Sequence, residues 1–132
     1  MPLTLDIVTP EKRVLSVACD EVRAPGVLGG FGIRLDHTDF MTELDAGRLT
    51  WVEGGVERHV AVGGGYLQVA ANHVIVLADS AEAAEEIDVE RARRALDESQ
   101  NRLLAMTEQD EHYAEEAARV RRAAARLRVA GQ

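Results

Sequence analysis

The chain has 132 residues, and its 23 acidic and 15 basic side chains leave a formal net charge of −8 at pH 7. This length suits one compact domain, or one domain with a small appendage, and the acidic balance argues against general nucleic-acid binding. A single cysteine excludes an intramolecular disulfide, and no apolar run approaches the roughly 20 residues that a membrane-spanning helix needs. We also expect no signal peptide, because the start lacks a basic region followed by an apolar stretch.

Charge and composition change together near residue 86. Residues 1–86 carry 6 basic and 14 acidic side chains, whereas residues 87–132 carry 9 of each. All three prolines and every glycine except Gly131 lie in the first part, and the second part is rich in alanine, arginine and glutamate. Glycine, proline and β-branched residues favour short strands and turns, while Ala, Arg and Glu favour helix. We therefore predict a β domain over residues 1–86 and a helical appendage over residues 87–132.

Short runs with apolar residues at alternate positions predict the strands of the first part. Turn signals separate them: residues 53–55 in a hairpin, residues 72–73 in a tight turn, and a glycine-rich stretch at 26–32 that we expect to bend sharply. No helical pattern lies between the runs, which excludes alternating βαβ units and favours a sandwich or barrel. The glycines at 63–65 lack the Lys and Ser/Thr of a phosphate loop, so we expect tight turns or close packing there. The predicted strands cover residues 3–8, 13–18, 20–24, 47–52, 56–62, 66–70 and 74–78.

Capping signals and apolar stripes predict two helices in the second part. Asp88 is placed to cap the first helix, and Thr107 and Asp110 have the Ncap and N3 spacing of a capping box for the second. We expect the second helix to end at about Val129, with Gly131 beyond it. The narrow stripes predict an antiparallel pair that packs on the β domain. They consist of Val89, Ala92, Leu96, Ser99 and Leu103 in the first helix, and of Tyr113, Ala117, Val120, Ala124 and Leu127 in the second.

The second helix is strongly polarised in charge. Its first half is acidic and its second half basic, which suits the helix dipole. Five arginines within ten residues exceed what a dipole requires, and such a surface suits an acidic protein partner or a phosphate group. Arg119, Arg122 and Arg126 share one face because they lie three and four residues apart. The five are Arg119, Arg121, Arg122, Arg126 and Arg128.

Several short motifs, taken in order along the whole chain, are typical of one known family. They are Ile7-Val8-Thr9-Pro10 followed by Arg13-Val14-Leu15, then Gly64-Gly65-Tyr66-Leu67-Gln68-Val69, the run from Val74 to Asp79, and Glu85-Glu86-Ile87-Asp88 before the helices. No single motif is decisive, but their order, spacing and position before a two-helix tail make the combination specific. The chain resembles the epsilon subunit of bacterial F-type ATP synthases.

The resemblance implies a ten-stranded β-sandwich followed by an antiparallel two-helix hairpin. It also implies a non-catalytic rotor subunit, peripheral to the cytoplasmic face of the bacterial inner membrane, that couples ion-driven rotation to ATP synthesis. The sandwich would bind the gamma subunit and the ring of c subunits. The five arginines would contact the alpha and beta subunits and oppose ATP hydrolysis.

The family's loop near the c-ring is diverged in this chain. Residues 34–39 lack both prolines and one glycine of the family pattern, so we expect a loop of different shape. The residues expected near the c-ring are Phe31, Arg34 and His37.

A further implication of the resemblance concerns ATP. Residues 87–92 are similar to a motif that binds ATP in some bacterial epsilon subunits, where ATP is a regulatory ligand and not a required cofactor. Asp88 would accept a hydrogen bond from the adenine amino group, and Arg91 would reach a ring or a phosphate. The alternative is that Asp88 only caps the helix and Arg91 only forms a surface ion pair. The expected site comprises Ile87, Asp88, Arg91, Ala92, Arg122 and Arg126.

Two other functions stay open from the residues alone. The chain could be a stand-alone β-sandwich binding module with a helical dimerisation arm. An enzyme could be built on Asp36, His37 and Asp39, since a histidine between carboxylates can act as a base or a metal ligand. That cluster lacks metal-ligand spacing, so we expect loop hydrogen bonds there and no metal site. Cys19 has no local base to activate it, and we expect it to be buried in a strand.

Overall fold

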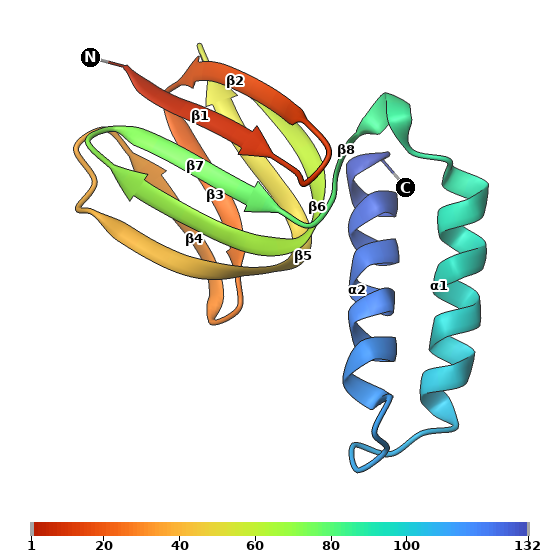
Figure 1. Ribbon diagram of the computed structural model, residues 1–132. Coiled ribbons are helices and arrows are strands. Elements are labelled where there is room, and N and C mark those ends of the chain that lie inside the picture. The colour runs from red at the N-terminus through yellow and green to blue at the C-terminus, as the bar shows by residue number, and fades with distance from the viewer. Residues whose placement is uncertain (1, 132) are drawn as a thin grey trace.

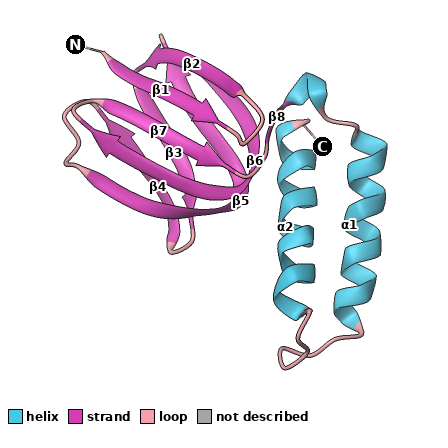
Figure 2. Cartoon of the chain, in the orientation of Figure 1, coloured by secondary structure: helices cyan, strands magenta, loops and turns pink. Residues whose placement is uncertain are grey.

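The computed structural model describes residues 2–131, which form an N-terminal β-sandwich followed by two antiparallel helices (Figure 1, Figure 2). This confirms the predicted fold class. A 3-10 turn (Ala84–Glu86) leads from the sandwich to α1 (Val89–Leu104) and α2 (Tyr113–Val129). The strands are β1 (Leu3–Val8), β2 (Arg13–Cys19), β3 (Glu21–Gly26), β4 (Gly29–Arg34), β5 (Phe40–Glu53), β6 (Val56–Ala70), β7 (His73–Ala78) and β8 (Ala81–Ala83).

One long antiparallel ladder between β5 and β6 connects the two layers of the sandwich. The second half of β6 pairs with β7, which continues to β1 and β2, while β5 pairs on its other side with β3 and then β4. Leu5 of β1 and Ile33 of β4 come from distant strands of this order, yet both are fully buried in the same core. The sheet therefore folds over on itself, and alternate residues of its strands fill the space between the layers.

The described residues contain eight strands, where the family resemblance implied ten. Residues 56–62 and 66–70, expected as separate strands, form the single strand β6. The glycines between these halves allow the strand to bend without ending, since Gly64 and Gly65 have φ angles of 104° and 136°. A Cβ atom at Gly65 would overlap the carbonyl oxygen of Leu77. The prediction that this glycine run serves close packing is thus confirmed.

Helix α1 begins after Asp88, as predicted. The backbone N–H of Arg91 donates a hydrogen bond to Asp88 Oδ1 at 3.1 Å, which satisfies a free amide of the first turn. Neither helix of the described chain is long and apolar enough to cross a membrane. The predicted stripe is the buried side of α1, with two members buried and three half-buried: Ala92 and Ser99, then Val89, Leu96 and Leu103.

Helix α2 begins at Tyr113, so the capping box predicted at Thr107 and Asp110 was wrong. The backbone N–H of Asp110 donates to the Thr107 carbonyl oxygen at 2.9 Å, and the Asp110 carboxylate accepts from the backbone N–H of His112 at 3.0 Å. These local bonds form turns in place of a first helical turn. The helix ends at Val129, as predicted.

Helix α2 lies between α1 and the sandwich (Figure 1), which confirms that the hairpin packs on the β domain. The single stripe predicted for α2 was wrong in part, because Leu127 is buried but Ala124 is exposed. Ala125 and Val129 instead pack on Ala61 of β6. A helix with neighbours on two sides has two buried faces, and one repeating spacing cannot describe both.

A buried carboxylate joins the two helices. Glu116 of α2 is 2% exposed, and it accepts hydrogen bonds from Arg102 of α1 and from Arg119, whose Nη1 lies 2.9 Å away. Arg102 also donates to Ser99 Oγ at 3.3 Å. The hydrogen bond from Arg102 is the main cause that lowers the pKa of Glu116 below its usual value, and Arg119 adds to it against the opposing effect of burial.

We predict that Glu116→Gln lowers the thermal stability of the helical hairpin at neutral pH. In acid, the stability of this variant and that of the wild type should become equal. A carboxylate whose pKa is lowered on folding contributes stability above its unfolded pKa, roughly 4.3 for Glu, and loses it as the pH falls through the folded value. Thermal unfolding followed by helical circular dichroism from about pH 7 to about pH 3 measures the effect.

Glu115→Gln is the matched control, because Glu115 is a neighbouring carboxylate of α2 that is exposed. A difference between the wild type and Glu116→Gln that stays constant into acid would contradict the role given to this ion pair.

Candidate functional site

The residues expected to bind ATP meet in part at the start of α1. A cavity of about 250 Å³ lies between this helix end, β8 and the end of α2, and its lining includes Asp88, Arg91, Ala92 and Arg126. This volume is slightly below the roughly 300–1,000 Å³ of most ligand pockets. Arg91 and Arg126 supply two guanidinium groups from different helices, an arrangement that suits phosphate oxygens.

Carboxylates share this cavity with the arginines. Glu82 of β8 and Glu86 line it together with Asp88. Glu82 Oε1 accepts a hydrogen bond from Arg126 Nε at 2.6 Å, so one of the two guanidinium groups already has an anionic partner. A polyphosphate would have to displace Glu82 from Arg126 to use this group.

Two of the expected ATP-binding residues lie apart from this cavity. Ile87 is buried beside Ala125 in the contact between α2 and the sandwich. Arg122 lines a cavity between the two helices and another beside the glycine run of β6. The structure therefore groups four of the six expected residues in this cavity and leaves Ile87 and Arg122 outside it, although Arg122 shares the cavity between the helices with Arg126.

Two arginines of α2 are held by carboxylates of the sandwich. Arg121 Nε donates to Asp45 Oδ1 of β5 at 2.9 Å, and Arg126 donates to Glu82 of β8. All four side chains keep part of their surface in solvent. Half-exposed pairs of this kind contribute about 0.2–1 kcal/mol each, so they hold α2 on the sandwich only weakly.

The other three arginines of α2 have no partner in the sandwich among residues 2–131. Arg119 pairs within the helix, with Glu115 at 3.0 Å and with the buried Glu116. Neither Arg122 nor Arg128 forms a hydrogen bond or an ion pair with any of the described residues.

Sequence reasoning did not find the sandwich carboxylates that hold α2. Asp45 is 76 residues from Arg121, and Glu82 is 44 residues from Arg126. Nothing in the local pattern marks either acid, because both lie in strands among other charged residues. Only the packing of α2 on β5 and β6 brings these pairs together.

The loop at 34–39 forms hydrogen bonds, as predicted, one of them to the distant turn at Asn72. Asp36 has a φ angle of 63°, and its backbone N–H donates to Asn72 Oδ1 at 2.6 Å. His37 Nδ1 donates to the carbonyl oxygen of Thr38 at 2.7 Å. In the described part of the chain, no group of three or more His, Cys, Asp or Glu side chains could hold a metal ion.

Cys19 is buried at the end of β2, as predicted. Burial raises the pKa of its thiol to about 11, with the nearby carboxylates of Asp20 and Glu53 acting in the same direction. The thiolate, which is the nucleophilic form of cysteine, is therefore scarce at neutral pH.

The three residues expected near the c-ring lie on or beside β4. Phe31 and His37 both contact Phe40 edge-on, with ring centroids 5.5 and 5.9 Å apart. Arg34 is exposed and forms an ion pair with Glu21 at 3.4 Å. Phe31 is partly buried against the core, so Arg34 and His37 offer the more accessible side chains.

The hairpin between β3 and β4 ends in an exposed apolar turn. Leu28 is 98% exposed and Val27 is 46% exposed. The glycine-rich stretch 26–32 bends here, as predicted, and the turn lies at the opposite end of β4 from Arg34. Sequence reasoning did not single out this exposed turn, although an apolar pair between glycines was the available signal.

Family models account for nearly the whole chain. Residues 2–84 match the family model described as the beta-sandwich domain of the ATP synthase Delta/Epsilon chain, and residues 85–131 match the model of its long alpha-helix domain. An ATP synthase epsilon chain of Anaeromyxobacter dehalogenans strain 2CP-1 is 74% identical over the full length of both chains. An ATP synthase epsilon chain of Myxococcus xanthus is 47% identical over 97% of this chain and 94% of the relative.

Solved structures share the fold at low sequence identity. A chain in a mitochondrial ATP synthase structure of Euglena gracilis, titled OSCP/F1/c-ring, superposes with a TM-score of 0.82 at 20% identity, covering 99% of this chain and 82% of that one. A chain in a central stalk and c-ring structure from Tetrahymena thermophila gives a TM-score of 0.62 at 17% identity, covering 99% and 95%. With both domain models matched in order and full-length relatives at this identity, the chain belongs to the ATP synthase delta/epsilon chain family, as an epsilon chain.

Proposed function

We propose that this chain is a non-catalytic rotor subunit of the central stalk in a bacterial F-type ATP synthase, where it couples rotation driven by protons or sodium ions to ATP synthesis. The observation that carries the proposal is the full-length identity of 74% to an epsilon chain, together with a sandwich and hairpin that match both family domains. As part of that complex, the chain would lie at the cytoplasmic face of the inner membrane.

The outer face of the sandwich suits the gamma subunit as a partner. Met41, Tyr66 and Leu77 lie on the neighbouring strands β5, β6 and β7, and each is at least half exposed. Tyr66 and Leu77 are direct partners in the ladder, so their side chains lie next to each other on one face. Adjacent exposed apolar side chains on a sheet are typical of a surface that a protein partner covers.

The β3–β4 hairpin suits contact with the c-ring. Its apolar turn at Val27 and Leu28 projects from the sandwich, and Arg34, His37 and Phe31 lie farther along the same strand and the loop after it. An exposed leucine gains about 1.5–3 kcal/mol when a partner buries it completely. The turn would therefore supply apolar contact, and the charged loop, at the other end of β4, would supply a separate polar contact.

We predict that Leu28→Glu lowers the amount of this chain that co-purifies with detergent-solubilised ATP synthase. Losing the burial of one leucine corresponds to a roughly tenfold or greater loss of affinity. Leu104→Glu is the control, because Leu104 is 85% exposed but lies at the end of α1. Equal retention of both variants in the complex would contradict contact through the β3–β4 turn.

The helical hairpin acts, in our proposal, as a brake on ATP hydrolysis. In the docked arrangement Arg121 and Arg126 are held by Asp45 and Glu82. The apolar part of the α2–sandwich contact is small, since it consists mainly of alanines with Ile87 and Val129. A contact this weak can open at modest cost, and the released arginines would then bind acidic segments of the alpha and beta subunits, together with Arg119, Arg122 and Arg128.

We predict that deletion of residues 88–132 raises ATP hydrolysis by the assembled complex, most of all at low ATP. Asp45→Asn combined with Glu82→Gln should have the opposite effect and lower hydrolysis by about twofold or more, because α2 then leaves the sandwich more often. The measurement is the steady-state hydrolysis rate of the reconstituted complex over a range of ATP concentrations.

Glu57→Gln is the control for the carboxylate variants, since Glu57 pairs with Arg23 of the sandwich and with no residue of α2 in the described chain. Unchanged hydrolysis after the deletion would refute the brake. If the double variant Asp45→Asn with Glu82→Gln hydrolyses ATP at the same rate as Glu57→Gln, then the carboxylates of the sandwich do not compete with those of the alpha and beta subunits for the arginines of α2.

ATP is the proposed regulatory ligand at the start of α1. Arg91 and Arg126 converge there on one cavity, with Asp88 beside them. ATP bound at this place would contact both helices near the sandwich and would favour the docked arrangement. Binding requires Glu82 to release Arg126. The phosphates would then replace the Glu82 carboxylate as the hydrogen-bond acceptor of Arg126.

We predict that ATP binds the full-length isolated chain, and that Asp88→Ala or Arg91→Ala weakens binding about tenfold or more. Each variant removes a hydrogen bond to a charged group, typically worth about 1.5–3 kcal/mol. Calorimetric titration measures the affinity, and circular dichroism checks that α1 survives the loss of its cap. Arg94→Ala, an exposed arginine of α1, is the control; equal weakening by Arg94→Ala would contradict this site.

A further inference from the structure

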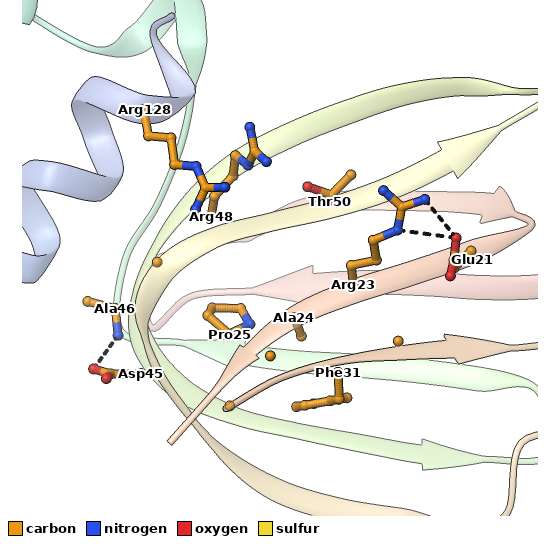
Figure 3. A pocket seen from close by; sticks show the side chains of 14 residues that line it. Glu21, Arg23, Ala24, Pro25, Phe31, Asp45, Ala46, Arg48, Thr50 and Arg128 are labelled. Carbon is orange, nitrogen blue, oxygen red and sulfur yellow. Dashed lines mark hydrogen bonds and ion pairs between the residues drawn. The ribbon is translucent and has the colours of Figure 1, made fainter. Parts of the chain in front are cut away.

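A second and larger cavity lies where the edge of the sandwich meets the end of α2. Its volume is about 690 Å³, within the usual range for small-molecule sites. Strands β3, β4 and β5 form its floor, and Arg128 of α2 closes one end beside Arg48 of β5 (Figure 3). It shares no lining residue with the cavity at Asp88.

Glycines leave the floor of this cavity free of side chains. In the ladder between β3 and β4, Gly32 is opposite Arg23 and Gly30 is opposite Pro25, so β4 has no side chain on this face at two successive positions. Pro25 and Phe31 add an apolar surface to the lining. At Gly30 the nearest atom to an added Cβ is the Ala24 carbonyl oxygen at 3.8 Å, so a side chain there would fill the cavity without a clash.

The charged groups that line the cavity leave an excess of positive charge. Arg23 is paired with Glu21 at 3.0 Å and with Glu57 at 2.8 Å, and Asp45 is paired with Arg121. Arg48 and Arg128 are the remaining cations, and neither forms a hydrogen bond or an ion pair with any residue in the described range 2–131. Every carboxylate of the lining is thus already paired, while two guanidinium groups are not.

These two arginines are close enough to affect the same neighbour. Burial and then the charge of Arg48 are the main causes that lower the pKa of His59 on β6, and Arg128 acts in the same direction. His59 Nδ1 also lies 2.7 Å from Thr50 Oγ1, a member of the cavity lining. The helix dipole favours a cation at the end of α2, which accounts for Arg128. Arg48 is half-buried, and the charge of Glu57 acts on it without a direct ion pair.

We propose that this cavity binds a small molecule that carries a phosphate group, with the phosphate between Arg48 and Arg128 and the rest of the molecule over the glycine floor of β4. Guanidinium groups bind phosphate oxygens through paired, charge-assisted hydrogen bonds. Because Arg48 belongs to the sandwich and Arg128 to α2, the bound phosphate bridges the two parts and strengthens the docked arrangement. The site is separate from the proposed ATP contacts at Asp88 and Arg91.

Calorimetric titration of the full-length chain at low salt tests this binding with two probes, pyrophosphate and ADP. We expect Arg48→Gln and Arg128→Gln each to weaken binding of pyrophosphate about tenfold or more, and Arg91→Ala to leave it unchanged. Arg94→Gln removes the same charge from an exposed position on α1 and is the control. The absence of pyrophosphate binding, equal weakening by Arg94→Gln, or weakening by Arg91→Ala alone would overturn the proposal.

Gly30→Leu distinguishes the two sources of the phosphate group. If ADP binds more tightly than pyrophosphate and Gly30→Leu removes that advantage, the ligand is an organic phosphate that occupies the glycine floor. If the two probes bind equally and Gly30→Leu changes neither, the ligand is the free phosphate group. Hydrogen exchange of α2 amides should slow with pyrophosphate in the wild type and not in Arg48→Gln; unchanged exchange in the wild type would overturn the bridging role.

Discussion

The ladder between β5 and β6 is the element on which the rest of the structure depends. It runs through nearly the full length of both strands and passes from one layer of the sandwich to the other. Its bend requires glycine, since Gly64 and Gly65 have positive φ angles and a side chain at Gly65 would overlap Leu77. The same two strands provide the surface on which α2 rests, so the bend also sets the position of the helical hairpin.

The two parts of the chain are stabilised by different kinds of contact. The sandwich has an extensive apolar core, in which residues such as Leu5, Ile33 and Leu49 are fully buried. The contact between α2 and the sandwich is made of small apolar side chains and half-exposed ion pairs. The first is stable and cooperative, while the second is weak enough to open without loss of the fold. This difference supports the proposed brake, in which the sandwich stays fixed and the hairpin moves.

Arginine is the residue through which the hairpin can respond to other molecules. In the docked arrangement Arg121 and Arg126 have carboxylate partners in the sandwich, and Arg128 lies beside Arg48 without one. In the proposed brake, each acid or phosphate that competes for these groups would change the balance between docked and released helices. The acidic sandwich and the basic end of α2 are therefore two halves of one electrostatic contact, even though the hairpin as a whole has no net charge.

The local sequence by itself determined the fold class, the Asp88 cap, the buried position of Cys19 and the end of α2. Each follows from alternation, helical spacing or one capping side chain, and these act over a few residues. The start of α2 was missed because Asp110 bonds to nearby backbone in a turn, which resembles a cap in sequence.

Tertiary structure alone decided which charges meet. Nothing in the local sequence pairs Asp45, Glu82 or Arg48 with α2. They lie near its arginines only because the helix crosses the middle of β5 and β6. The glycine floor of the large cavity has the same origin, since Gly30 and Gly32 leave a hollow only when β4 pairs with β3 in this register. Interactions between residues close in sequence determine the helices and strands. Ion pairs and cavities instead depend on contacts between residues that are distant along the chain.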